Sequence, residues 1–247
     1  MEPIERALDV ALTVMRNGGS TVMADRTFRN ILKGYKQDGV VATWRLDLVA
    51  ASSVMEGRSS IILRPVGPIG VNLVRASQAS VLGERVARGE VDDAALVSEI
   101  ERINGLAPPF NRWVMIAAAA LSAASFSRIA GGDWGSLVTV LMAAGIGQFV
   151  RSLLQDRKLP VAPVTLFCSV LSTFIAAAGL RLGLSQTAPA TAIASIIYMV
   201  PGLPLINGFV DLVSHKHLIL GLERIANAAY LFLAMAVAIA LAYGVVM

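Results

Sequence analysis

The stretch YMVPGLPLINGFVDLV, residues 198–213, sets two prolines, two glycines, an asparagine and an aspartate into otherwise apolar sequence. In a membrane a proline leaves a backbone carbonyl unpaired at a cost of several kcal/mol, so broken helices occur where protein or a water-lined cavity satisfies the freed groups. We expect Pro201 and Pro204 to interrupt a membrane helix. Gly202 and Gly208 then allow a neighbour to approach closely. The alternative is a helix that ends before the first proline and continues as a turn at the membrane interface.

The whole chain has the composition of a membrane protein. Of its 247 residues, 55% are hydrophobic and 15% are charged, and the mean hydropathy is +0.66, which is too apolar for an ordinary soluble domain. Residues 1–112 hold 14 of the 21 Lys/Arg and 13 of the 17 Asp/Glu. We therefore expect a polar cytoplasmic domain over residues 1–107 and a membrane domain over residues 108–247. The net charge of +4 arises mostly in loops, so it indicates topology and does not indicate nucleic-acid binding.

Five apolar segments are candidates for helices that cross the bilayer, which requires about 20 apolar residues. They are residues 113–131, 136–150, 161–180, 182–210 and 225–247. The fourth is free of charge over a length that exceeds one straight span, which leaves room for a break inside the membrane. The loop after the second contains Arg151, Arg157 and Lys158, whereas the two opposite loops contain only Arg128 and Arg181. This pattern predicts a multi-pass membrane protein with its N-terminal domain in the cytoplasm and its C-terminus outside.

The polar part of the chain alternates helix and strand signals. Helical periodicity covers residues 3–17, a second helix follows Ser20 or Thr21, and β-prone segments lie within residues 40–66 with a tight turn at 56–57. Two further helices are expected over residues 71–89 and after Asp92 or Asp93. The expected fold class is an α+β domain of order ααβββαα, followed by an all-α domain of five membrane helices, the fourth broken by Pro/Gly.

The polar domain contains no histidine, no cysteine and no known catalytic or nucleotide-binding motif. We therefore predict no enzyme and no cofactor. A membrane-anchored hydrolase built on Ser, Asp and Lys is the alternative, and a scaffold that only stabilises a partner is a third hypothesis. His215 and His217 lie in one predicted loop, where two ligands are more typical of a hydrated surface pair than of a metal site. The prediction for metal is accordingly none.

Four residues of the chain are candidates for binding or proton coupling through their side chains. Asn207 and Asp211 are four apart and share one face if a helix resumes after Pro204, where an amide and a carboxylate can bind a polar solute or carry a proton. The alternative is that Asp211 caps an interfacial turn. Arg64 and Arg224 are candidates for attracting an anionic substrate, with snorkelling or structural roles as the alternative.

Several motifs resemble those of a known transporter family. VPGLPLINGFVDL (200–212) and GLERIANA (221–228), together with NGGST (17–21) and AGGDW (130–134), resemble the N-terminal module of the threonine/serine exporter family. The resemblance is closest to the larger subunit of its split, two-subunit succinate-exporting members. It implies a secondary exporter of small carboxylates, threonine/serine or dicarboxylates, that is driven by a proton gradient. It also implies a second small multi-span membrane subunit as partner in the lipid bilayer, and homo-oligomerisation is a further possibility.

Overall fold

The computed structural model describes residues 3–55, 58–157 and 159–246. The expected turn at 56–57 and the loop residue Lys158 lie outside the described residues. By their internal contacts the residues group into two units. The first unit comprises residues 1–109 and 202–226, and the second comprises residues 110–201 and 227–247.

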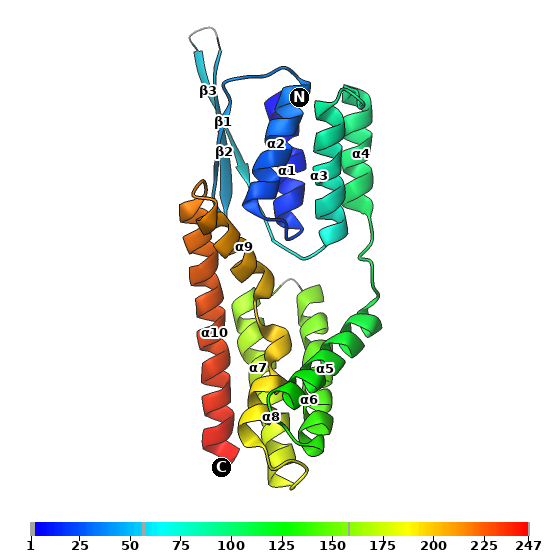
Figure 1. Ribbon diagram of the computed structural model, residues 1–247, viewed down its shortest axis with the longest axis vertical. Helices are drawn as coiled ribbons and strands as arrows, with labels where there is room; N and C mark the ends of the chain where they lie inside the picture. Colours follow the sequence, from blue (N-terminus) through cyan, green and yellow to red (C-terminus); the bar gives the residue numbers. More distant parts are fainter. Residues whose placement is uncertain (1–2, 56–57, 158, 247) are drawn as a thin grey trace. The chain divides into compact units, whose positions relative to one another are not determined.

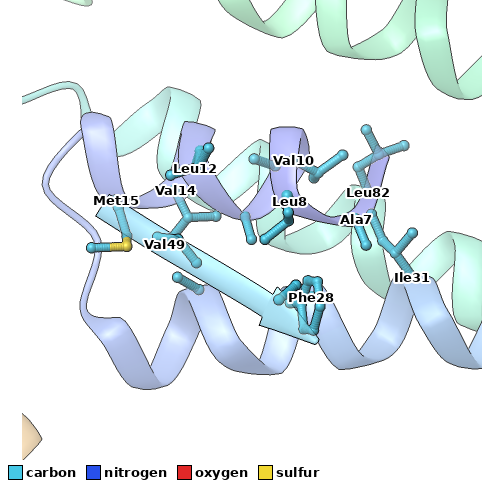
Figure 2. Close-up of a cluster of buried hydrophobic side chains, with 14 of the residues drawn as sticks. Ala7, Leu8, Val10, Leu12, Val14, Met15, Phe28, Ile31, Val49 and Leu82 are labelled. Carbon is cyan, nitrogen blue, oxygen red and sulfur yellow. The ribbon is translucent and has the colours of Figure 1, made fainter. Parts of the chain in front are cut away.

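Four helices pack together in the first unit (Figure 1). They are α1 (Pro3–Arg16), α2 (Thr21–Gly34), α3 (Leu73–Ala87) and α4 (Asp93–Gly105). A side chain caps the N-terminus of α2, α3 and α4, namely Ser20, Asn72 and Asp92, because each supplies an oxygen to an otherwise unpaired N–H. Figure 2 shows the buried apolar side chains that join α1, α2 and α3, among them Leu8, Phe28 and Leu82.

A three-stranded antiparallel sheet completes the polar part of this unit. Its strands are β1 (Val41–Trp44), β2 (Leu48–Met55) and β3 (Arg58–Pro65), in the order β1-β2-β3. Val49 and Ala51 of the central strand are buried in the helical core, and Trp44 meets Phe28 edge to face with ring centroids 6.0 Å apart. The strand residues alternate between the core and the surface, as period-2 side-chain geometry requires.

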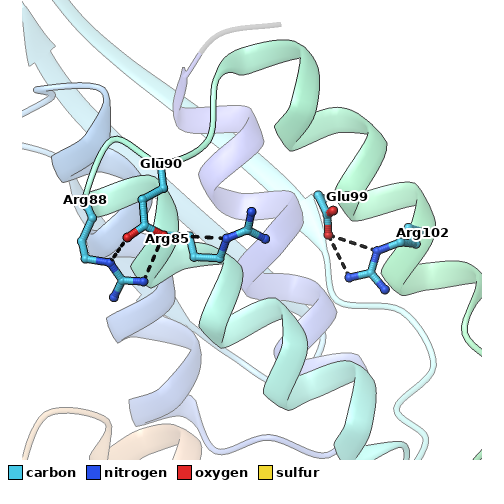
Figure 3. A network of polar contacts seen from close by, with 5 residues as sticks. All are labelled: Arg85, Arg88, Glu90, Glu99 and Arg102. Carbon is cyan, nitrogen blue, oxygen red and sulfur yellow. Dashed lines mark hydrogen bonds and ion pairs between the residues drawn. The ribbon is translucent and has the colours of Figure 1, made fainter.

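The outer surface of α3 and α4 is rich in ion pairs (Figure 3). Arg85 and Arg88 pair with Glu90, and Arg102 pairs with Glu99 on the next helix. The hydrogen bond from Arg88 lowers the pKa of Glu90, and that from Arg102 lowers the pKa of Glu99. Because such exposed pairs are screened by water, they contribute little to stability. This face is a solvated surface.

The first unit also contains α9 (Gly202–Val213) and the beginning of α10 (Leu218–Val246). The buried residues of α9 are Asn207, Gly208 and Asp211, while Ile206, Phe209 and Val213 are exposed. This helix therefore has its polar face inside and its apolar face outside. That arrangement is the reverse of a helix at a water-exposed surface and suits contact with lipid or another apolar surface.

The second unit is a bundle of helices that pack closely through small residues. It contains α5 (Arg112–Ile129), α6 (Trp134–Asp156), α7 (Val161–Arg181), α8 (Ala188–Ser195), the 3-10 helix η1 (Ile197–Met199) and the rest of α10. A Cβ added to Gly179 would lie 2.4 Å from the Thr139 side chain, so α6 and α7 approach closely only because that position is glycine.

The AGGDW segment ends one helix and starts the next. Gly131 has φ +85°, a conformation that favours glycine. Asp133 accepts hydrogen bonds from the backbone N–H of Ser136 (2.6 Å) and of Gln186 (2.7 Å), and these bonds lower its pKa. Arg128 lies over the Trp134 ring, 4.5 Å from its centroid. Asp133 of the motif thus caps α6 and also binds the connection between α7 and α8 through Gln186.

The predicted fold class is wrong, because five membrane helices are not found among the described residues. Three helices are long and apolar enough to cross a membrane: α6, α7 and Leu218–Ala242 of α10. A fourth is reached only if α8 with η1 and α9 count as one broken span. The expected span 113–131 falls short because α5 has an arginine near each end and contains three serines, and these residues lower its mean hydropathy. The described residues are mostly helical and form one small sheet.

The position of the break also differs from the expectation. The chain leaves η1 at Val200, whose ψ of 125° is the extended conformation that a following proline imposes. The next helix already begins at Gly202. Pro204 therefore lies in the first turn of α9, where an N–H has no helical partner to lose. Pro201 is the residue that interrupts the helix.

Candidate functional site

Asn207 and Asp211 lie on the buried face of α9, within the first unit. Their exposed fractions are 9% and 0%, and both side chains meet the turn between α1 and α2. The amide of Asn207 donates a hydrogen bond to the carbonyl of Gly18 (3.0 Å). The hydroxyl of Thr21 donates to Oδ2 of Asp211 (2.8 Å). Two side chains one helical turn apart therefore bind a segment that lies about 190 residues earlier in the chain.

The α1–α2 turn is shaped to present these partners. Gly18 has φ +89°, which favours glycine. A Cβ on Gly19 would lie 2.4 Å from the side chain of Val14. Ser20 caps α2 through Met23, and this places Thr21 in the first helical turn with its hydroxyl toward α9. The NGGST sequence therefore supplies one carbonyl and one hydroxyl at fixed positions.

Arg224 of α10 faces the same carboxylate. Its Nε lies 3.5 Å from Oδ2 of Asp211, and only 5% of the arginine is exposed. Close approach of α9 and α10 permits the pair, since a Cβ on Gly221 would lie 2.9 Å from the carbonyl oxygen of Gly208. Burying two charges is costly unless they compensate each other. Within the described part of the chain, Oδ1 of Asp211 and Nε of Arg224 have no hydrogen-bond partner, so the pair retains unused hydrogen-bonding capacity.

His217 lies beside this pair, at the start of α10. Burial lowers its pKa, and the charges of Asp25 and Asp211 act in the opposite direction. Its Nε2 is buried and has no hydrogen-bond partner among the residues described. His215, by contrast, is exposed, with φ +54° in the turn. In the described ranges no group of three or more His, Cys, Asp or Glu side chains is arranged to hold a metal ion.

The other predicted site residues are distributed differently. Arg64 lies on β3 and pairs with Glu5 of α1 (2.8 Å), so the structure does not bring it to the carboxylate of Asp211. Pro201 and Gly202 mark the start of α9, and Pro204 follows in its first turn. The residues brought together are Asn207, Gly208, Asp211 and Arg224, with Thr21 and Gly18 added from the first 109 residues.

The three segments that meet here are NGGST, PGLPLINGFVD and GLER, and comparison with known proteins identifies the family of the chain that contains them. The model of the ThrE family, described as "Putative threonine/serine exporter", matches residues 6–246. The chain belongs to this family. Its relatives are transporters and not enzymes, and its apolar helices are those of a multi-pass membrane protein. The alternative of a membrane-anchored hydrolase has no support from the family.

The similar proteins are of two kinds, namely transporter subunits of similar length and a longer exporter. The chain is 24% identical to the probable succinate transporter subunit YjjP of Klebsiella aerogenes over 95% of its own length and 90% of that protein. It is likewise 24% identical to YjjP of Escherichia coli K12, over 95% of this chain and 91% of the relative. It is 20% identical to a probable threonine/serine exporter of Mycobacterium tuberculosis, over 92% of this chain and 43% of that protein. No solved structure matches the chain.

Thr21 and Gly18 were absent from the candidate residues drawn from the sequence. A threonine at the first position of a helix looks like an ordinary N-terminal residue, and Gly18 looks like an ordinary helix end. The available signal was the NGGST motif itself, which the family resemblance already singled out. Only the structure shows that the polar atoms of this motif have partners on α9.

Proposed function

We propose that this chain is one subunit of a two-subunit secondary exporter of small carboxylates in a bacterial inner membrane. The observation that carries the proposal is the share of each relative's length that this chain matches. The chain corresponds to 90% and 91% of two proteins named succinate transporter subunits, but to only 43% of the mycobacterial exporter. The name of the first two relatives implies a partner subunit. The same comparison favours a dicarboxylate over threonine or serine as the substrate.

We assign proton coupling to the cluster around Asp211. Protonation would neutralise the carboxylate and leave the buried guanidinium of Arg224 uncompensated, which is strongly unfavourable. The pair would then separate, and the hydrogen bond to Thr21 would transmit that change to the α1–α2 turn. Asn207 and Gly208 hold α9 in register with this turn and with α10, and the Pro201–Gly202–Pro204 segment starts the helix that carries them.

The orientation of the chain is part of the proposal. Lys216 lies just before α10 and Arg224 lies in its second turn, whereas residues 225–247 contain no charged residue, so the start of α10 is expected inside and its end outside. Residues 1–109 belong to the same unit as the start of α10. The N-terminal part is therefore cytoplasmic and the C-terminus is external.

Export assays with and without the partner test this function. The chain is expressed in cells that lack their own succinate and threonine exporters, alone and together with a small multi-span membrane protein encoded beside it. Efflux of succinate is expected only on co-expression, and threonine efflux is expected to be weaker. Membrane abundance of the chain, measured by immunoblot, is the control. Robust efflux by the chain alone would contradict the two-subunit proposal and favour a homo-oligomer.

A further inference from the structure

A pocket of about 270 Å³, open on one side and called the cavity below, lies among α5, α6 and η1 of the second unit. Its polar lining is Ser122 of α5, Gln148 and Arg151 of α6, and Tyr198 of η1, and small or apolar side chains such as Ala119 complete the wall. This volume lies just below the roughly 300–1,000 Å³ of pockets for drug-sized ligands. It suits a metabolite of a few carbon atoms.

Arg151 is the charged group of this cavity. It lies in a helix that is long and apolar enough to cross the membrane, where a charged side chain is costly and by default functional. In the portion of the chain that the structure describes, no Asp or Glu forms an ion pair with it. A guanidinium offers five N–H donors in a planar fork that matches a carboxylate. The cavity therefore contains a cation whose counter-charge is not supplied by the described residues.

The break in the helix at Pro201 explains how Arg151 is held. In η1 the N–H groups of Met199 and Val200 donate to carbonyls three residues earlier. The next donor in this series would be residue 201, which is proline and has no N–H. The carbonyl of Tyr198 is thereby freed, and it accepts a hydrogen bond from Nη1 of Arg151 (3.1 Å). The remaining guanidinium donors are then oriented by a fixed partner and do not simply extend toward the headgroups.

Tyr198 and Gln148 complete a built polar wall. The hydroxyl of Tyr198 is hydrogen-bonded to Ser172 (2.9 Å). A Cβ on Gly147 would lie 2.0 Å from that hydroxyl oxygen, so Tyr198 occupies this place only because position 147 is glycine. Gln148 lies three residues before Arg151 and thus on the same face of α6. Among the residues the structure describes, its Oε1 is buried and has no hydrogen-bond partner.

We propose that this cavity is the carboxylate-binding site of the exporter, with Arg151 as the anchor of one substrate carboxylate. The amide of Gln148 takes the other end of the substrate: its N–H₂ would donate to a second carboxylate, and its oxygen would accept from an ammonium group. This inference rests on the proposed function. It separates the roles of the two units, with substrate recognition at Arg151 and coupling at Asp211.

The test uses the complex of this chain with its partner subunit, reconstituted in liposomes. Succinate counterflow, which needs no proton gradient, gives the affinity for succinate, and competition with threonine compares the two substrate classes. Arg151→Gln is expected to raise the half-saturating succinate concentration about tenfold or more, which is about 1.4 kcal/mol or more of binding free energy. Arg157→Gln, at the exposed end of the same helix, is the matched control and is expected to leave it unchanged.

Ala119→Leu provides an independent variant, because it fills the cavity and leaves the charge of Arg151 in place. It is also expected to weaken succinate counterflow, and gel filtration establishes that each variant complex is intact. If the wild-type complex shows no saturable carboxylate counterflow, the proposed function fails and this site fails with it. If the wild type transports and both Arg151→Gln and Ala119→Leu retain its affinity, the assignment of the cavity is overturned while the exporter function stands.

Discussion

At the scale of single residues, Asp211 is fixed by two neighbours of different kinds. Thr21 donates a hydrogen bond to its Oδ2, and Arg224 compensates its charge at 3.5 Å. Losing one partner of a buried ion pair leaves the other charge uncompensated and typically costs about 3–5 kcal/mol, whereas neutralising both is often tolerated. Comparing the single and double substitutions therefore distinguishes a role of Asp211 in proton coupling from a role in stability alone.

The residue-scale prediction compares a single and a double substitution. Asp211→Asn is expected to lower the melting temperature of the purified protein, because Arg224 stays charged and buried. The double variant Asp211→Asn with Arg224→Met is expected to regain most of the lost stability, yet to remain inactive in proton-driven succinate export. The measurements are thermal unfolding in detergent and efflux with the partner subunit.

A matched variant tests the neighbouring hydrogen bond. Thr21→Val keeps the shape of the side chain and removes the donor to Asp211, so export should fall while the ion pair persists. If the double variant exports at the wild-type rate, Asp211 and Arg224 serve only to stabilise the fold.

At the scale of elements, α9 and α10 meet through two glycines. A Cβ on Gly208 would lie 2.9 Å from the side chain of Ile225, and one on Gly221 would lie 2.9 Å from a backbone carbonyl oxygen. Real Cβ atoms almost never approach so closely, so an added methyl must push the helices apart. The separation would also carry Arg224 away from Asp211.

The element-scale prediction follows from that contact. Gly208→Ala combined with Gly221→Ala is expected to destabilise the protein, since overpacking typically costs about 1–3 kcal/mol, more than the roughly 1 kcal/mol that alanine gains over glycine within a helix. Gly202→Ala is the control, because no atom lies within 4 Å of its added Cβ. The measurement is thermal unfolding of the wild type, the double variant and the control. Equal stability of the double variant and the control would show that α9 and α10 can move apart without loss of stability.

At the scale of the whole molecule, the first unit contains both the N-terminal 109 residues and the start of α10. Several contacts fix that association: Glu223 pairs with Arg45 and accepts a hydrogen bond from the N–H of Leu46, and Leu220 is buried in the same core. Since the two segments lie together, we expect them on the same side of the membrane. We expect the C-terminus, beyond a helix long enough to span, on the other side.

The whole-molecule prediction concerns topology. A reporter that is active only outside the cytoplasm should be active when fused after Met247 and inactive when fused at the N-terminus, and a cytoplasmic reporter should give the opposite result. A third fusion at Arg157 shows whether α6 is the first crossing, in which case that position is external. Both termini on the same side would contradict the proposed orientation.

The sequence by itself determined the class of protein and the longest membrane helices. Three of the five expected segments lie in α6, α7 and α10, because a charge-free run of about 20 apolar residues has few alternatives to a membrane helix. The sequence also carried the motifs that place the chain in its family. The sequence-based prediction was wrong for the alanine-rich segment of α5 and for the long apolar run that is divided among α8, η1 and α9. A segment whose mean hydropathy is close to the lower limit for a membrane span does not fix the number of crossings.

Only the tertiary structure decided which polar atoms meet. Asn207 and Asp211 were predictable as one helical face, since period 3.6 is a local property. Their partners Gly18 and Thr21 lie about 190 residues away, and the hydrogen bond from Arg151 to Tyr198 spans 47 positions. The periodicity of a sequence indicates which face of a helix or strand a residue occupies. The packing of distant elements determines which residues contact that face. This packing satisfies buried polar groups and excludes any larger residue at Gly147 or Gly208.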